Sequence, residues 1–202
     1  LSYFDIFMLS YFRTSEEVWS YNLVYPLAEL LTATLSAFSF IAMPILSQLH
    51  SDDRSTEMDR TYKVVTKWIF MATLPPMLIL VFFPTASIRM TFGLEYTDGS
   101  LALVALALGF FTHSVAGPNM NMLTAIGQTR IIMWDNLMAG AVNIILNFAL
   151  IPEYGILGAA VATSLSYSGL NVLYSVQVYR QTGIHPLTSA LLKPAFTGIL
   201  SM

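Results

Sequence analysis

Two apolar helices joined by a very short turn constrain this chain more than any other feature of its sequence. Residues 146–163 read LNFALIPEYGILGAAVAT, so an apolar helix meets a Pro-Glu-Tyr-Gly turn at 152–155 and a second helix follows at once. A connection this short makes the two helices antiparallel neighbours. The Gly and Ala residues of the second helix let the backbones approach closely, as in packed membrane helices. The segment therefore predicts a hairpin of two membrane spans.

The composition of the whole chain fits membrane helices. Hydrophobic residues make up 55% of it and charged residues 10%, whereas a soluble domain carries about 25% charged residues. A net charge of −3 without a basic stripe argues against nucleic acid as a partner. The absence of cysteine excludes disulfides and thiolate metal sites. Because the sequence begins and ends within apolar runs, we expect a fragment of a longer polytopic protein.

Apolar runs of about 20 residues, bordered by charges, predict the individual spans. The complete spans are expected at 18–49, 68–90, 101–127, 131–151 and 156–179. Two partial spans are expected at the ends of the sequence. Residues 1–185 then form one transmembrane unit that is truncated in its first span, and 186–202 begin a further span. The predicted fold class is an all-α, polytopic transmembrane helix bundle.

Two proline motifs should disturb these spans. Pro75-Pro76 is expected to kink the span at 68–90, because a proline removes a helical hydrogen bond and its ring crowds the preceding turn. Gly117-Pro118 should break the span at 101–127 near its middle, and we interpret this pair as a hinge.

One charged segment, residues 51–67, separates the second and third of these spans. Met58, Tyr62 and Val65 follow the i, i+4, i+7 spacing of one helical stripe, and charged residues cover much of the remainder. We expect a separate helix at the membrane interface, with Trp68 at the level of the lipid headgroups.

The distribution of Lys and Arg between alternate loops predicts the orientation of the protein in a plasma or inner membrane. Six basic residues lie on one side and two, Arg13 and Arg89, on the other. The six are Arg54, Arg60, Lys63, Lys67, Arg130 and Arg180. The loops at 51–67, 127–130 and 180–186 are therefore expected in the cytoplasm.

Signatures of catalysis are missing from the sequence. It has no Gly-rich phosphate loop, no His-x-x-x-His pair, no Gly-x-Ser-x-Gly and no cysteine nucleophile. The pair Asp52-Asp53 lacks the additional carboxylates of a metal-dependent glycosyltransferase and is interpreted as a solvated loop. We expect no enzymatic activity, no cofactor and no metal centre.

Polar residues within the spans are the remaining functional candidates. A charged group in the bilayer costs about 2.5–3.5 kcal/mol on insertion scales, so it normally faces protein or water. Asp5 lies in the first span and Glu29 in the second. Glu29 is followed at helical spacing by Thr32, Ser36 and Ser39, which predicts one polar face along a water-filled cavity.

Amide and imidazole groups form the second set of candidates. Asn136, Asn143 and Asn147 share one helical face, and His113 and Asn119 flank the predicted break. The three asparagines are explained either by substrate contacts or by interhelical hydrogen bonds of about 0.6 kcal/mol each. For His113 a proton carrier and a packing donor are both open. The complete set of cavity candidates is Asp5, Glu29, Thr32, Ser36, Ser39, His113, Asn119, Asn136, Asn143 and Asn147.

An ordered series of short motifs resembles the polysaccharide flippase family. These motifs are DIFML (5–9), PILS (44–47), FGLEY (92–96), AGPN (116–119), MLTAIGQTR (122–130), NIILN (143–147), LIPEYGI (150–156) and GAAVAT (158–163). Together they extend over nearly the whole chain. The family belongs to the multidrug, oligosaccharidyl-lipid and polysaccharide exporter superfamily.

This resemblance implies a protein of two six-helix lobes around a central cavity, of which the chain is the second lobe. It implies transfer of lipid-linked sugars to the outer leaflet, with membrane lipid and the missing N-terminal lobe as partners and H⁺ or Na⁺ as a possible coupling cation. In the family the first two helices of each lobe line the cavity, which extends that role to Asp5 and Glu29. The alternatives are a cation-coupled multidrug antiporter of the same superfamily and a membrane-embedded glycosyltransferase, for which the outer loops are too short.

The predicted orientation can be tested by labelling single cysteines with a membrane-impermeant thiol reagent in intact cells. A cysteine at Thr97 should react and one at Ser55 should not, because the charge bias places Ser55 in the cytoplasm. Both should react after the cells are permeabilised, and the reverse pattern in intact cells would contradict the orientation.

Overall fold

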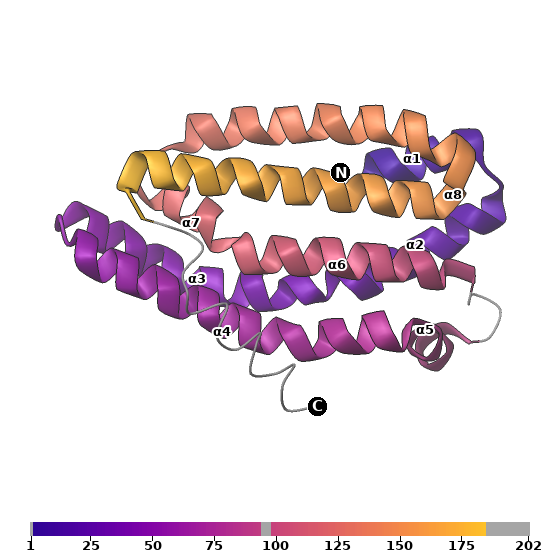
Figure 1. The fold of residues 1–202 in the computed structure, drawn as a ribbon, viewed down its shortest axis with the longest axis horizontal. Coiled ribbons are helices and arrows are strands. Elements are labelled where there is room, and N and C mark those ends of the chain that lie inside the picture. The colour runs from indigo at the N-terminus through magenta and orange to yellow at the C-terminus, as the bar shows by residue number, and fades with distance from the viewer. Residues whose placement is uncertain (1, 94–97, 185–202) are drawn as a thin grey trace.

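The computed structural model describes residues 2–93 and 98–184, and all regular structure in these ranges is helical (Figure 1). This confirms the predicted all-α class. The expected further span at 186–202 and the labelling position Thr97 lie outside the described residues. The helices are α1 (Ser2–Phe12), α2 (Ser15–Glu29), α3 (Leu31–Ser51), α4 (Ser55–Phe82), α5 (Pro84–Phe92), α6 (Ser100–Ala116), α7 (Pro118–Ala125) and α8 (Thr129–Thr182).

Four stretches of the described helices are long and apolar enough to cross a membrane, namely α3, α4, α6 with α7, and α8. Helix α8 has 54 residues and folds back on itself, so it consists of two long antiparallel halves. Helix α6 lies between the other long helices and packs against α2, α3, α4 and α8. Its buried residues, including Leu103, Leu106 and Phe110, form the centre of the apolar core.

The reversal of α8 lies at Gly155, within the predicted turn, and its two halves run antiparallel (Figure 1). Gly155 has φ 56° and ψ −132°, a conformation that residues with a Cβ rarely adopt. The halves approach closely just beyond the turn, since a Cβ built on Gly158 would lie 2.6 Å from the carbonyl carbon of Leu150. The small residues of the second half therefore have the close-packing role that the sequence predicts.

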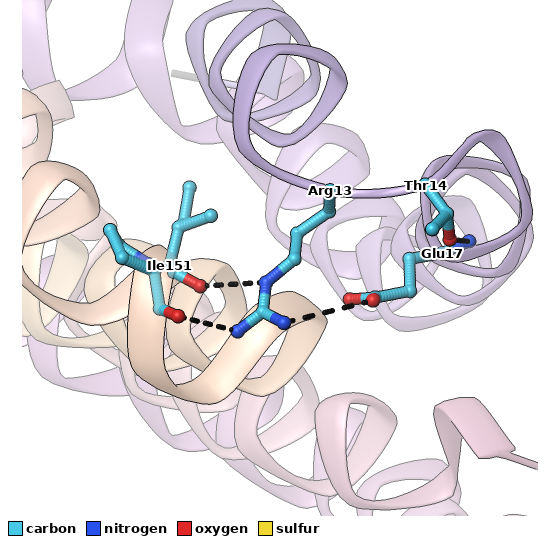
Figure 2. Close-up of polar contacts among 5 residues, drawn as sticks. Arg13, Thr14, Glu17 and Ile151 are labelled. Carbon is cyan, nitrogen blue, oxygen red and sulfur yellow. Dashed lines mark hydrogen bonds and ion pairs between the residues drawn. The ribbon is translucent and has the colours of Figure 1, made fainter.

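Arg13 fastens the turn of α8 to the junction of α1 and α2 (Figure 2). Its Nε donates to the carbonyl of Ile151 at 3.0 Å and an η nitrogen donates to that of Pro152 at 2.8 Å. Another η nitrogen lies 4.0 Å from the Glu17 carboxylate. The last carbonyls of a helix lack intrahelical donors and attract positive charge. Arg13 provides both the donors and the positive charge. The sequence alone predicted only a residue in a polar loop.

The predicted helix at 18–49 is wrong in its limits, because two helices occupy this region and meet at Leu30. The hydroxyl of Thr32 donates to the carbonyl of Glu29 at 2.8 Å. The amide of Ala33, which would use that carbonyl in a regular helix, donates instead to Leu30 at 3.1 Å. Side-chain bonding of this kind bends helices.

The expectation of a separate interfacial helix at 51–67 is also wrong, because α4 begins at Ser55 and continues into the span without interruption. The apolar stripe of the charged segment stays in phase with the buried stripe of the span, so a single face packs throughout. That stripe is Met58, Tyr62, Thr66, Ile69, Thr73, Met77 and Leu80. At about 1.5 Å per residue, α4 is about 42 Å long and exceeds the hydrocarbon thickness.

The other end of this span also differs from the prediction of 68–90. Helix α4 continues through Pro75 and Pro76, ends at Phe82, and is followed by the short helix α5. Phe83, at the junction, has φ −127° and ψ 48°. A residue that precedes proline is disfavoured in helical conformation, and Pro84 occupies the first turn of α5, where its missing N–H costs nothing.

The helix ends gather at the two ends of the bundle (Figure 1). The α3–α4 junction, the α7–α8 junction and the end of α8 lie at one end, and the α1–α2 junction, α5 and the turn of α8 lie at the other. Successive connections between the long helices therefore lie at alternate ends of the bundle, as the predicted orientation requires.

The close approach at Gly158 predicts a large cost for adding a methyl group there. Gly158→Ala should lower the free energy of unfolding by about 1–3 kcal/mol, because the backbone of α8 must shift. Gly140→Ala is the matched control, since nothing lies within 4 Å of its Cβ position. It should be neutral or stabilise the helix by up to about 1 kcal/mol. Thermal unfolding in detergent measures both, and equal stability of the two variants would contradict the packing argument.

Candidate functional site

A buried polar cluster surrounds the carboxylate of Asp5. Its Oδ1 accepts from Asn147 Nδ2 at 2.6 Å, and its Oδ2 accepts from Thr163 Oγ1 at 2.5 Å and from the Tyr21 hydroxyl at 3.1 Å. Asn143 completes the cluster, since its Nδ2 lies 3.5 Å from Thr163 Oγ1. Asp5, Asn143 and Asn147 are all 0% exposed. Three of the predicted candidates are thus brought together in the interior of the bundle.

The hairpin of α8 explains how these groups meet. Asn143 and Asn147 are one helical turn apart on the first half of α8, so they face the same side. Asn147 and Thr163 lie eight positions on either side of Gly155, and residues equidistant from an antiparallel turn stand opposite each other. Helix α1 packs on α8 and contributes the carboxylate of Asp5.

One atom in this cluster lacks a partner. Asn147 Oδ1 is buried and makes no hydrogen bond with the residues that the structure describes. The Nδ2 of the same side chain lies 3.3 Å from Asn143 Oδ1 in addition to its contact with Asp5. An unsatisfied buried acceptor costs about 1–3 kcal/mol, so it indicates either strain or a missing ligand.

The second group of candidates lies on an uncovered surface of α2 and α3. Glu29 and Ser36 are exposed, and Thr32 and Ser39 are half-buried. The hydroxyl of Ser36 donates to the Thr32 carbonyl at 3.2 Å, and Ser39 Oγ accepts from Asn121 Nδ2 at 2.7 Å. Ser36 and Ser39 line an open depression of about 640 Å³ together with residues of α7, including Asn121 and Thr124.

A third group joins α4, α6 and α7 to the second half of α8. The Tyr62 hydroxyl donates to Asn119 Oδ1, and Asn119 Nδ2 donates to Ser175 Oγ at 2.8 Å. His113 Nδ1 accepts from Asn171 Nδ2 at 3.1 Å. The His113 ring also lies against Tyr167, with 4.6 Å between the ring centres. A mainly apolar pocket of about 370 Å³ lies beside this group, between Thr66, Asn119 and Asn171.

Asn136 lies apart from these groups. Its Nδ2 donates to the Tyr174 hydroxyl at 2.7 Å and so links the two halves of α8 near their open end. Asn136 and Tyr174 are each nineteen positions from Gly155. All three asparagines of the predicted stripe therefore bond to neighbouring helical segments.

The predicted hinge lies at a change of helix. Helix α6 ends at Ala116 and α7 begins at Pro118. Pro118 has no N–H to donate to the Ser114 carbonyl. That carbonyl accepts instead from Gly117 N at 3.3 Å. Gly117 also faces α3, because a Cβ built on it would lie 2.9 Å from Leu35 Cγ.

Sequence reasoning missed several partners of the candidate residues. Tyr21, Thr163, Tyr62, Asn171 and Ser175 all complete polar contacts within the bundle. A usable signal existed for Thr163, since its equal spacing from the turn places it opposite Asn147. Tyr21 and Tyr62 gave none, because an aromatic residue in a span is ordinarily part of the apolar core. The described residues hold no group of three or more His, Cys, Asp and Glu suited to a metal ion.

Comparisons with known proteins give three relatives of low identity. An uncharacterized membrane protein of Methanocaldococcus jannaschii is 27% identical over 170 residues, which is 83% of this chain and 33% of the relative. The probable low-salt glycan biosynthesis flippase Agl15 of Haloferax volcanii is 25% identical over 86% of this chain and 37% of the relative. The capsular polysaccharide biosynthesis protein CapF of Staphylococcus aureus is 28% identical over 65% of this chain and 33% of the relative.

No family model matches the chain, and no solved structure matches it. The chain spans about a third of the length of the curated relatives it matches. Their names and the four apolar helices support a membrane location. The chain is thus similar to one protein named as a membrane protein and to two proteins named for glycan or polysaccharide biosynthesis.

Proposed function

We propose that this chain is one lobe of a flippase that moves lipid-linked oligosaccharide or polysaccharide precursors across a plasma or inner membrane by alternating access. The observation that carries the proposal is the similarity to a probable glycan biosynthesis flippase over 86% of the chain. The other lobe is the natural partner. In this proposal the end of the bundle that holds the α3–α4 junction, the α7–α8 junction and the end of α8 faces the cytoplasm.

The uncovered polar face of α2 and α3 supports this function. Glu29 is exposed fourteen positions after the start of α2, about 21 Å along the helix axis. A carboxylate at that depth is unfavourable against lipid and is expected against water or protein. Hydroxyl, amide and carboxylate groups such as Ser36, Asn121 and Glu29 can hydrogen-bond a sugar headgroup, while the lipid tail stays in the bilayer.

A cation-coupled multidrug antiporter is the second candidate, and the buried carboxylate of Asp5 is the observation that favours it. Such a protein needs an apolar and aromatic substrate pocket. The depression beside Ser36 and Ser39 is mainly apolar, with Phe40, Met43 and Pro44 in its lining, so it is compatible with such a pocket. The exposed carboxylate of Glu29 and the similarity to a probable glycan biosynthesis flippase are the observations that favour a sugar substrate.

The two functions are separated by reconstituting the whole protein in liposomes. A fluorescent lipid-linked oligosaccharide should become accessible in the opposite leaflet much faster than in protein-free liposomes. An imposed Na⁺ or H⁺ gradient should not drive transport of a cationic dye. Dye transport without movement of the lipid-linked sugar would contradict the proposal and favour the antiporter.

Glu29→Gln should reduce sugar translocation by about tenfold or more, equivalent to about 1.4 kcal/mol in the transition state. The carboxylate is lost while size and membrane insertion are retained. Glu153→Gln is the matched control, because Glu153 is exposed at the turn of α8, and it should transport at the wild-type rate. Unchanged transport in Glu29→Gln at equal protein level would remove Glu29 from the substrate path.

Pro118→Ala should slow translocation severalfold without loss of inserted protein. Alanine restores an N–H that can donate to the Ser114 carbonyl, so α6 and α7 would join into one straighter helix. Gly117 is left unchanged because a Cβ there would collide with Leu35. Pro76→Ala, in the uninterrupted helix α4, is the control. A wild-type rate in Pro118→Ala would show that the break is not a moving part.

A further inference from the structure

We propose that the outer face of the first turns of α4 binds the phosphate of an anionic phospholipid, in the leaflet at that end of the bundle. A shallow depression of about 430 Å³ lies on this face, and its lining includes Arg60, Lys63, Val64 and Lys67. These residues follow the i, i+3, i+4, i+7 spacing of one helical stripe. Arg60, Val64 and Lys67 are exposed, so the stripe points out of the bundle, away from the buried stripe of α4.

The carboxylates of this face are neutralised within α4 and the residue that precedes it. The carboxylate of Glu57 lies 2.6 Å from the guanidinium of Arg54, and that of Asp59 lies 2.5 Å from the ammonium of Lys63. The Lys63 side chain thus extends toward the N-terminus of α4, which is the direction in which helical side chains tilt. Since Glu57 and Asp59 are the carboxylates in the lining of the depression, each carboxylate there has a basic partner.

Arg60 and Lys67 keep uncompensated positive charges. Neither residue takes part in the ion pairs found among residues 2–93 and 98–184. The guanidinium of an arginine presents planar donors that match phosphate oxygens, and the ammonium of a lysine attracts phosphate as a point charge. Because Arg60 and Lys67 line the same depression, the charge left on this face complements a phosphate anion.

The length of α4 puts these cations at the border of the hydrocarbon layer. Helix α4 is long and apolar enough to cross a membrane, and it ends at Phe82. Counted back from Phe82, a layer of about 30 Å takes about 20 residues of helix, which puts its border near Tyr62. Arg60 then lies just outside the hydrocarbon, and the Cα of Lys67 lies about 8 Å inside it. An exposed lysine at that depth must extend its ammonium to the headgroups, and the tilt of helical side chains directs it there.

The apolar neighbours of the stripe favour a lipid over a soluble anion or an acidic protein segment. Val64, Trp68 and Met71 continue the same face toward the middle of α4, and each is about half exposed. An indole near the border of the bilayer packs between headgroups and acyl chains. A phospholipid with its phosphate on Arg60 and Lys67 covers these three side chains with its acyl chains, whereas a soluble phosphate leaves them uncovered.

The experiment measures quenching of Trp68 fluorescence by brominated lipids in phosphatidylcholine liposomes that contain the whole protein. The other tryptophans are replaced by phenylalanine, so that Trp68 alone reports. Brominated phosphatidylglycerol and brominated phosphatidylcholine are titrated separately. Because quenching requires contact, the two titrations give the relative affinity of the site for the two headgroups. Phosphatidylglycerol should be preferred by about fivefold or more, and added salt should weaken the preference.

Variants then locate the effect. Arg60→Gln combined with Lys67→Gln should reduce the preference to about one, because both charges are lost while most of each side chain is kept. Arg130→Gln combined with Arg180→Gln is the matched control and should keep the preference. Arg130 and Arg180 are exposed at the same end of the bundle, so the net charge changes equally. If the protein with the single tryptophan fails to fold, native mass spectrometry of the protein with all its tryptophans compares bound phosphatidylglycerol and phosphatidylcholine instead.

Three results would overturn the proposal. The first is equal affinity of the wild-type protein for the two lipids. The second is a preference that survives the loss of Arg60 and Lys67, or that the control variant loses to the same extent. The third is relief of the quenching by millimolar inorganic phosphate, since this would identify a soluble ligand. None of these measurements follows a sugar substrate, so failure of the lipid site and failure of the flippase proposal are distinguishable.

Discussion

The reversal of α8 at Gly155 is the constraint on which the polar contacts between α1 and α8 depend. It sets the two halves of α8 side by side, so that Asn147 and Thr163 converge on Asp5. It also presents the carbonyls of Ile151 and Pro152 to Arg13. Helix α1 is thereby held to the hairpin at two levels, by its carboxylate in the core and through the Arg13 guanidinium at the turn.

The polar residues of the long helices lie in two different environments. Those around Asp5 are enclosed and bonded to one another, as polar groups inside a membrane protein must be. Those that begin with Glu29 lie on a surface that the described residues leave open. The first set therefore joins helices within the bundle, and the second leaves polar groups free to meet another surface or a ligand.

Much of the fold followed from the sequence, because lipid exposure demands long apolar runs that are visible without knowledge of tertiary contacts. The hairpin and the change of helix at Gly117 were visible because Gly and Pro act locally. The junction at Leu30 was not visible in the sequence, because it depends on the hydrogen bond from the Thr32 hydroxyl to the Glu29 carbonyl. The continuity of α4 was not visible either, because the charges of its first three turns resemble a membrane border, while its buried stripe keeps one phase throughout.

The candidate site was only partly predictable. Asp5, Asn143 and Asn147 could be named from their polarity within apolar runs, but their convergence required the packing of α1 on α8. Tyr21 and Tyr62 contribute single hydroxyls from side chains that are otherwise apolar core. The hydrogen-bond partner of such a hydroxyl can be predicted only when the helix that faces it is known. The role of Arg13 likewise depends on a turn 138 positions away along the chain.

The matched spacing around Gly155 requires that the two halves of the hairpin keep the same number of residues between the turn and each pair. Asn136 with Tyr174, and Asn147 with Thr163, are paired because each pair is equidistant from the turn. Removing one residue from either half would rotate everything beyond it by about 100° and shift it by about 1.5 Å. An insertion or deletion in one half would put the pairs out of register, and an equal change in the other half would be needed to realign them.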